Sequence, residues 1–301
     1  MVDASAAEFE QHRRFLTGLA YRMLGSLADA QDIVQDAFLR WHGAARASIA
    51  SPRAWLGTTV TRLCLDRMKS ARARRESYVG QWLPEPVIAP LDAADAARAT
   101  EERIDAPVAL MLAMERLSPL ERAVFILHEL FEFGFDEIAG AIDRSEAACR
   151  QLLVRARGHV GEDRPRFAVD ADEAARIATA FFAAIGSGDA SQLRDLLAET
   201  ALMQSDGGGK RLAVLEILRG AETISDFFAS VAQKQGPEAF RDWSGPLWIN
   251  GLPGYVSADD SGLPQTTALE IEDGRVVAIY IMRNPDKLAG AEAFLPAPTT
   301  P

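Results

Sequence analysis

The chain has 301 residues, of which 48% are apolar and 25% charged, and its net charge is −11. These values are typical of a globular protein with room for two or three domains. No apolar run approaches the roughly 20 residues that span a bilayer, and the start, MVDASAAEFEQHRR, lacks the apolar core of a signal peptide. The sequence therefore predicts a cytoplasmic protein without a membrane segment.

An acidic chain is a poor partner for a polyanion unless its charge is unevenly divided, and here it is. Residues 1–80 hold 12 Lys and Arg against 8 Asp and Glu, and residues 143–166 hold 6 against 4. Screening over about 8–10 Å at physiological salt lets such local basic surfaces attract phosphate. The acidic remainder should weaken binding to free DNA, so we expect a partner to supply affinity, or the acidic half to restrain the basic one.

Three helices are predicted first, at residues 9–24, at residues 28–42, and from Pro52 to beyond residue 69, because apolar residues recur every three or four positions. Two outer faces carry polar and charged side chains: Asp29, Asp32, Gln35 and Asp36 on the second helix, and Arg53, Thr58, Arg62 and Lys69 on the third, which continues into Arg72. Residues 79–105 are rich in Pro, Ala and Asp and predict a linker that contains an apolar island, WLPEP.

Helices resume at residues 106–117, and Ser118 followed by Pro119 is typical of the start of another. Residues 134–160 then have the spacing of a helix-turn-helix, in which Ser145 caps a second helix starting at Glu146. Arg and Gln on the outer face of that helix can pair with guanine and adenine edges in a major groove. The alternative is an ordinary helical hairpin with a solvated arginine face.

Residues 167–290 predict an α+β domain, and residues 291–301 a flexible tail. Its helices are expected at 174–185, 190–197 and 222–231, and its strands at 201–204, 211–215, 240–243, 247–250, 255–258, 267–271 and 276–282. The two cysteines, Cys64 and Cys149, fall on apolar helix faces and predict buried, reduced thiols.

Residues 8–164 resemble a bacterial sigma factor of the extracytoplasmic-function group. The resemblance rests on DAQDIVQDAFLRWH, SPRAWLGTTVTRLCLDRMKSAR and LSPLERAVFILHELFEFGFDEIAGAIDRSEAACRQLLVRAR, which occur in family order. It implies sigma region two at residues 1–78 and region four at residues 106–164, both all-α, with the linker in place of region three. The C-terminal part is similar to a SnoaL-like domain of the NTF2-like, cone-shaped α+β class.

This resemblance implies a promoter-specificity subunit, not an enzyme, with no cofactor and no metal site. Its implied partners are core RNA polymerase, through the β′ clamp and β flap, and promoter DNA. The polymerase contacts would be Asp29, Asp32, Gln35 and Asp36. The −10 contacts would lie on Arg53, Thr58, Arg62, Lys69 and Arg72, beside the loop 45–51, which has no aromatic residue to hold unstacked bases. The −35 contacts would be Arg144, Ser145, Glu146, Ala147, Arg150, Gln151, Arg155 and Arg157.

Three strings are similar to markers of the sigma-J-like subgroup that carries this fusion, in which the additional domain is thought to regulate sigma activity in cis. They comprise Trp82, Leu83 and Pro84 of WLPEP; Asp206, Gly207, Gly208, Gly209 and Lys210 of DGGGK; and Asn284, Pro285, Asp286, Lys287 and Leu288 of NPDKL. The glycines lack the context of a P-loop, so we expect them to admit close approach of NPDKL or WLPEP. Burial of Trp82 and Leu83 would be worth about 2–4 kcal/mol.

Two alternatives stay open for the C-terminal domain. It could be a cyclase or isomerase-type enzyme, although every histidine and cysteine precedes it, so that only carboxylates, Tyr255, Tyr280 or Lys could serve in catalysis. It could also be a sensor that binds a small apolar ligand in a pocket lined by residues such as Phe181, Trp243 and Trp248.

Overall fold

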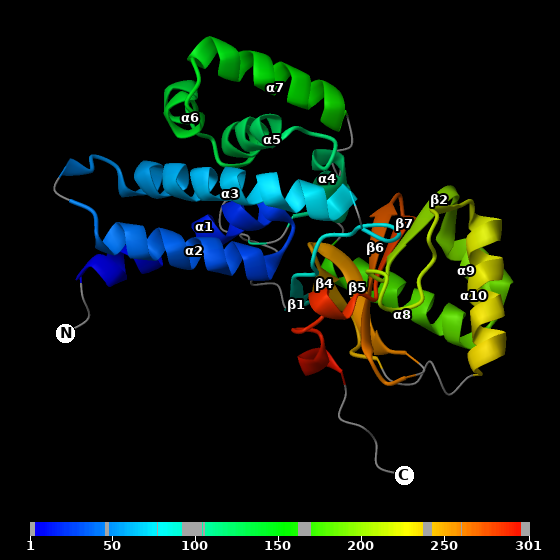
Figure 1. Cartoon of the computed structure of the whole chain (residues 1–301). Helices are drawn as coiled ribbons and strands as arrows, with labels where there is room; N and C mark the ends of the chain where they lie inside the picture. Colours follow the sequence, from blue (N-terminus) through cyan, green and yellow to red (C-terminus); the bar gives the residue numbers. More distant parts are fainter. Residues whose placement is uncertain are drawn as a thin grey trace. The chain divides into compact units, whose positions relative to one another are not determined.

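The computed structural model describes residues 4–45, 48–76, 78–91, 104, 106–161, 170–236, 243–259 and 261–295 (Figure 1). The chain divides into two compact units. The first, here the helical unit, comprises Met1–Ser77 and Ala97–Arg164, and the second, the sheet unit, comprises Tyr78–Ala96 and Pro165–Pro301. Among the described helices, none has the length and apolar character needed to cross a membrane.

The helical unit contains the three N-terminal helices and the predicted helix-turn-helix. Its elements are α1 (Ala4–Leu24), α2 (Leu27–His42), α3 (Pro52–Glu76), α4 (Val108–Met114), α5 (Pro119–Phe125), the π-helical turn η3 (Ile126–Leu130), α6 (Phe135–Ile142) and α7 (Glu146–Val160). Ser118 and Glu121 form a capping box at the start of α5, which confirms the predicted helix start there. The π-helical turn has no counterpart in the sequence prediction.

The two groups of helices in this unit pack directly on each other. Arg122 of α5 is 1% exposed and donates a hydrogen bond to the carbonyl oxygen of Met23 in α1 (3.0 Å) and another to that of Met114 (3.0 Å). Its guanidinium also pairs with Glu115 (2.6 Å). A buried cation is tolerated only where its donors are satisfied, so this arginine fixes α5 against the end of α1.

The described part of the sheet unit is a seven-stranded sheet with three α-helices. Its elements are β1 (Ile88–Pro90), α8 (Ala171–Ser187), α9 (Ala190–Leu196), β2 (Leu197–Asp206), β3 (Leu218–Arg219), α10 (Ala221–Gln235), β4 (Leu247–Ile249), β5 (Leu252–Ala258), β6 (Pro264–Glu272), β7 (Arg275–Met282), η5 (Pro285–Lys287) and η6 (Glu292–Phe294). The strand order is β1-β4-β5-β6-β7-β2-β3, antiparallel except for the β2–β7 pair. A core of apolar side chains joins the helices to this sheet.

The structure corrects two of the predicted elements. Residues 211–215 form no strand but a loop, because Arg211 turns its side chain to Asp259 and to the carbonyl oxygen of Pro264. Part of the expected linker belongs to the sheet unit, since β1 pairs with β4 and the amide of Val87 donates to Asn250 Oδ1 (2.5 Å). Most of the expected strand 240–243 lies outside the described residues.

The ion pair of Asp259 with Arg211 predicts that the sheet unit loses stability in acid. Burial alone would raise the pKa of Asp259, but hydrogen bonds from Arg211 and from the amides of Leu263 and Ser261 outweigh burial and lower the pKa below its ordinary value. A depressed pKa contributes stability that is complete above the unfolded-state value, about 3.9, and is lost as pH falls through the folded-state value.

We therefore expect Asp259→Asn to lower the free energy of unfolding by about 2 kcal/mol at pH 7 and to flatten its dependence between pH 5 and pH 2. Denaturant titrations over this pH range measure both effects. The control is Asp195→Asn, at an exposed carboxylate of α9, which should keep the wild-type profile. If the free energy of unfolding of the Asp259 variant still fell between pH 5 and pH 2 as it does in the wild type, Asp259 would not be the group responsible.

Candidate functional site

The second helix of the helix-turn-helix begins as the sequence predicts. Ser145 accepts a hydrogen bond from the amide of Ala148 (3.2 Å), and Asp143 takes a left-handed backbone conformation (φ 53°) that ends α6. Residues 143–145 thus form the turn between α6 and α7. The buried face of α7 holds Cys149, Leu152, Leu153, Ala156 and Val160. The opposite face is exposed and is the candidate surface for DNA.

Arginines on the exposed side of α7 are held by carboxylates. Arg150 pairs with Glu146 (2.9 Å), Arg155 with Glu121 (2.9 Å), and Arg157 with Glu129 (2.5 Å). Each arginine side chain remains more than half exposed. The pairs orient the guanidinium groups without removing them from water, so their contribution to stability is small and they stay accessible to phosphate.

The carboxylate of Glu121 is the most constrained of these partners. Burial alone would raise its pKa, but hydrogen bonds from Arg155 and from Ser118 lower the pKa below its ordinary value. Arg144, by contrast, donates to the carbonyl oxygen of its neighbour Asp143 (2.7 Å). Its side chain is exposed at the turn.

Two of the predicted −10 residues on α3 contact the other helices of the helical unit. Arg62 donates to the carbonyl oxygens of Gly140 (2.7 Å) and Ala141 (3.1 Å) at the end of α6. Arg53 donates to the carbonyl oxygen of Phe131 (3.2 Å). A helix C-terminus carries partial negative charge, so these contacts satisfy the cations in the absence of DNA.

Aromatic rings complete this contact. The guanidinium carbon of Arg53 lies 4.8 Å from the ring centre of Phe15 and 5.0 Å from that of Phe133. The two rings are stacked, with centres 6.2 Å apart. Gly57 of α3 leaves room for Phe133, because a Cβ atom at that position would lie 2.8 Å from the ring. We call the contacts of α3 with residues 131–141 the closing contact.

The remaining predicted −10 residues are placed differently. Lys69 is exposed and pairs with Asp66 (2.8 Å), and Thr58 is half-buried. Arg72 lies in α3, but its side chain falls outside the described residues, as do residues 46–47 of the loop 45–51. The structure therefore places Lys69 on an open face and Arg53 and Arg62 in the closing contact.

The candidate polymerase face of α2 is partly neutralised. Arg67 of α3 pairs with Asp29 (3.2 Å) and Asp32 (3.3 Å), whereas Gln35 and Asp36 are exposed. Leu39 lies on the same face, one turn after Asp36, and is 60% exposed. Leu39 was not among the predicted contact residues, although its apolar side chain outside the buried stripe of α2 could have indicated it.

The three marker strings meet within the sheet unit around one carboxylate. Asp206, at the end of β2, is fully buried and pairs with Lys287 Nζ (2.8 Å). It also accepts hydrogen bonds from Tyr78 Oη (2.6 Å) and from the amides of Leu83 (2.9 Å) and Gly208 (2.9 Å). A buried carboxylate with a cation and three further donors is well satisfied.

Lys287 is the second centre of this cluster. Its ammonium donates to the carbonyl oxygen of Leu83 (2.6 Å) and lies 5.0 Å and 4.6 Å from the ring centres of Tyr78 and Trp82. Asn284 donates to the hydroxyl oxygen of Tyr78 (2.8 Å). Tyr78, which was not among the predicted site residues, therefore connects two of the strings, DGGGK and NPDKL. Its burial and its bond to Asp206 raise the pKa of Tyr78, so it stays protonated.

The glycines of DGGGK permit these approaches. A Cβ atom would lie 2.2 Å from the carbonyl oxygen of Arg211 at Gly207, 2.4 Å from the Asn284 side chain at Gly208, and 3.0 Å from Val79 at Gly209. Gly208 and Gly209 also have positive φ angles (62° and 68°). The exposed pair of Lys210 and Asp286 (2.7 Å) joins two of the strings at the surface.

Pro285 begins the turn η5, and Leu288, just after it, is 3% exposed. Leu83 is 2% exposed and Pro84 is also buried, so part of the WLPEP island packs on the sheet unit. We call residues 78–90, which carry this island and β1, the anchor segment.

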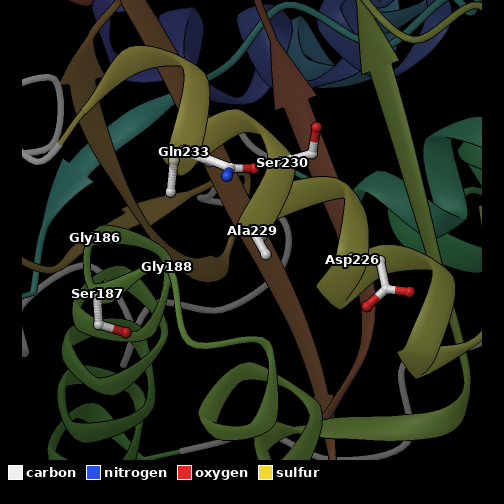
Figure 2. A pocket seen from close by; sticks show the side chains of 8 residues that line it. Gly186, Ser187, Gly188, Asp226, Ala229, Ser230 and Gln233 are labelled. Atoms are coloured by element: carbon white, nitrogen blue, oxygen red, sulfur yellow. The ribbon is translucent and has the colours of Figure 1, made fainter.

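Two of the three aromatic residues expected to line a ligand pocket, Phe181 and Trp243, pack against other rings, and the third, Trp248, is buried in β4. Phe182 and Trp243 stack with ring centres 4.4 Å apart, and Phe181 meets Phe228 edge to face. An open cavity of about 690 Å³ lies elsewhere, between the end of α8 and α10 (Figure 2). The single carboxylate of its lining, Asp226, is exposed and is 3.8 Å from Arg194, so this cavity holds no pair of carboxylates for acid–base chemistry. Among the described residues, no cluster of ligands could hold a metal ion.

Comparisons with known proteins agree with this architecture. Residues 9–74 match the Sigma-70 region 2 family, and residues 108–160 match the Sigma-70 region 4 family. The ECF RNA polymerase sigma factor SigJ of Mycobacterium tuberculosis is 40% identical over 95% of this chain and 93% of its own length. The probable sigma factor SigI of the same species is 32% identical over 97% of this chain and 98% of its own.

The fold is shared as well. The crystal structure of SigJ from M. tuberculosis superimposes with a TM-score of 0.75 at 35% identity and covers 95% of this chain and 98% of that chain. Helical modules followed by an α+β domain, as the sequence predicts, are thus confirmed. Because two sigma families match in order and a full-length relative exceeds 30% identity, the chain belongs to the extracytoplasmic-function RNA polymerase sigma factors, which bind core RNA polymerase and direct promoter-specific initiation.

Proposed function

We propose that α7 enters the major groove of the −35 element and that α3 contacts the −10 element. The support for α7 is its capped start, its exposed outer face, and the arginines that carboxylates hold along both sides of that face. The candidates are Arg144, Ser145, Glu146, Ala147, Arg150, Gln151, Arg155 and Arg157 for the −35 element, and Arg53, Thr58, Arg62, Lys69 and Arg72 for the −10 element.

The polymerase contact is assigned to α2. Asp32, Gln35 and Asp36 with the exposed Leu39 form one face, which suits a basic partner surface with an apolar contact at its centre. Asp29 borders this face and shares Arg67 with Asp32. We assign the β′ clamp to this face and the β flap to the region-four helices, and we place the protein in the cytoplasm with the polymerase.

The sheet unit regulates the two DNA-binding modules in cis by holding the anchor segment. The observation that carries this is the burial of Asp206, which binds Tyr78 and Leu83 from the chain between α3 and α4. While the anchor segment is bound to the sheet unit, fewer residues of the connection between α3 and α4 are free to extend. Each free residue can span at most about 3.5 Å, so the connection reaches less far. The distance that α3 and α7 can reach is therefore limited by the sheet unit, which acts as a structural regulator and not as a catalyst.

The shortened linker affects DNA binding through the closing contact. Arg53 and Arg62 cannot hold both the carbonyl oxygens of residues 131–141 and the promoter backbone. DNA engagement by α3 therefore requires the closing contact to open, and a short free linker disfavours opening. Core polymerase supplies the compensating contacts when it binds the two modules separately.

The assignment of α7 is tested with the full chain and core RNA polymerase. Duplexes selected from a random library by this holoenzyme define the −35 element. We expect the double substitution Arg150→Ala and Gln151→Ala to weaken open-complex formation about tenfold or more on the selected promoter, because the base contact of Gln151 and the phosphate contact of Arg150 are both lost. Arg176→Ala, at an exposed arginine of α8, is the control. Equal output from the double variant and the wild type would refute the assignment.

A further inference from the structure

The exposed face of α7 divides into an uncharged strip with charged borders. At about 100° per residue, Ala147, Gln151, Val154 and Gly158 fall within an arc of about 60°. Arg150 and Arg157 border one side of this strip and Arg155 borders the other. All four residues of the strip are exposed.

The borders and the strip differ in how they are held. Each bordering arginine is bound to a carboxylate of Glu146, Glu121 or Glu129. Arg150 also lies over the ring of Phe135, 4.7 Å from its centre. Within the described part of the chain, Gln151 has no hydrogen-bond partner, and Val154 is 67% exposed with no apolar cover. The cations are therefore preorganised at the edges, and the uncharged side chains are free at the centre.

A helix in a major groove presents its central strip to the base edges and its borders to the two phosphate walls. The bordering arginines suit the phosphates, which are negative on both walls. An exposed valine suits the one apolar group that base edges display in this groove, the 5-methyl group of thymine. Val154 also lies one helical turn from Gln151, whose amide can pair with adenine.

We propose that Val154 is a specificity-determining residue that recognises a thymine in the −35 element by contact with its 5-methyl group. This inference rests on the proposed entry of α7 into the −35 groove. It assigns base recognition to the uncharged strip and leaves Arg155 and Arg157 as phosphate contacts.

Replacing thymine by deoxyuridine removes only the 5-methyl group, so any loss of binding reports the contribution of that group alone. The probe is the −35 duplex selected by the wild-type holoenzyme, with each thymine replaced in turn. We expect one position at which the replacement weakens wild-type binding about fourfold, as for one buried methyl-sized group. Val154→Ala should bind the thymine duplex as weakly as the wild type binds the deoxyuridine duplex, and should lose the response to replacement.

Val154→Thr is the matched variant, because threonine keeps the shape and one γ-methyl group and should retain part of the response. Both substitutions are at an exposed position, so the fold is preserved. The proposal is overturned if no thymine responds to replacement, or if Val154→Ala keeps the full wild-type response. Failure of the Arg150 and Gln151 double variant to affect −35 dependence would instead overturn the entry of α7 into this groove.

Discussion

Replacing Asp206 by Ala should release the anchor segment and destabilise the sheet unit by about 3–5 kcal/mol. The substitution leaves Lys287, whose side chain is 13% exposed, without its carboxylate, and removes an acceptor from Tyr78, Leu83 and Gly208. Breaking a buried pair on one side costs more than the pair contributes, because the remaining charge is uncompensated. Denaturant unfolding of the full chain measures this loss.

A double-substitution cycle separates the charge from the packing. Asp206→Ala combined with Lys287→Met removes both charges and should be less destabilised than the sum of the two single variants. The control is Asp286→Ala, which breaks the exposed pair with Lys210 in the same two strings and should cost at most about 1 kcal/mol. Additive effects in the cycle would show that Asp206 and Lys287 are not coupled.

The local and regulatory consequences have separate measurements. The amide of Leu83 donates to Asp206, so its hydrogen exchange should accelerate in Asp206→Ala while the core strand β7 is still protected. The free protein should then bind promoter DNA more tightly, because the restraint on the linker is lost. If the Leu83 amide exchanges faster in Asp206→Ala but promoter affinity is unchanged, then Asp206 anchors this segment but the anchoring does not regulate DNA binding.

Much of this organisation is readable from the sequence because it depends on local patterns. The cap at Ser145, the capping box of Ser118 and the inward stripe of α7 follow from residue types at fixed spacings. The glycines of DGGGK are an exception, because they indicated a close approach by NPDKL or WLPEP from far along the chain. NPDKL lies at Gly208, whereas WLPEP meets the string at Asp206. Interactions between neighbours in sequence are the ones that a single sequence encodes most directly.

What the sequence could not give depends on long-range pairing. Residues 211–215 are mostly apolar, as a buried strand is, but the buried pair of Arg211 with Asp259 holds them as a loop. Residues 88–90 are too short to indicate a strand, and β4 supplies the partner that makes them one. The carbonyl contacts of Arg53 and Arg62 were equally hidden, because an arginine on a helix face has no sequence signal for its acceptor.

Replacing Gly57 by Val should open the closing contact without changing any candidate DNA-binding residue. A Cβ atom at Gly57 would lie 2.8 Å from the ring of Phe133, which is already confined by Phe15 and Arg53. Overpacking of this kind costs about 1–3 kcal/mol, and 2 kcal/mol would shift the ratio of open to closed molecules about thirtyfold.

The expected result is tighter binding of promoter DNA by the free protein, with output from the assembled holoenzyme close to that of the wild type, because we propose that polymerase already holds the two modules apart in that complex. Fluorescence anisotropy with a labelled promoter duplex measures the first effect and in vitro transcription the second. Gly290→Val is the control, since its Cβ would meet nothing within 4 Å and the residue lies outside the closing contact. Circular dichroism establishes whether both variants retain their helices. If Gly57→Val folds and binds free DNA no better than Gly290→Val, then the closing contact does not limit access of α3 to the promoter, and the restraint imposed by the sheet unit must act on another step.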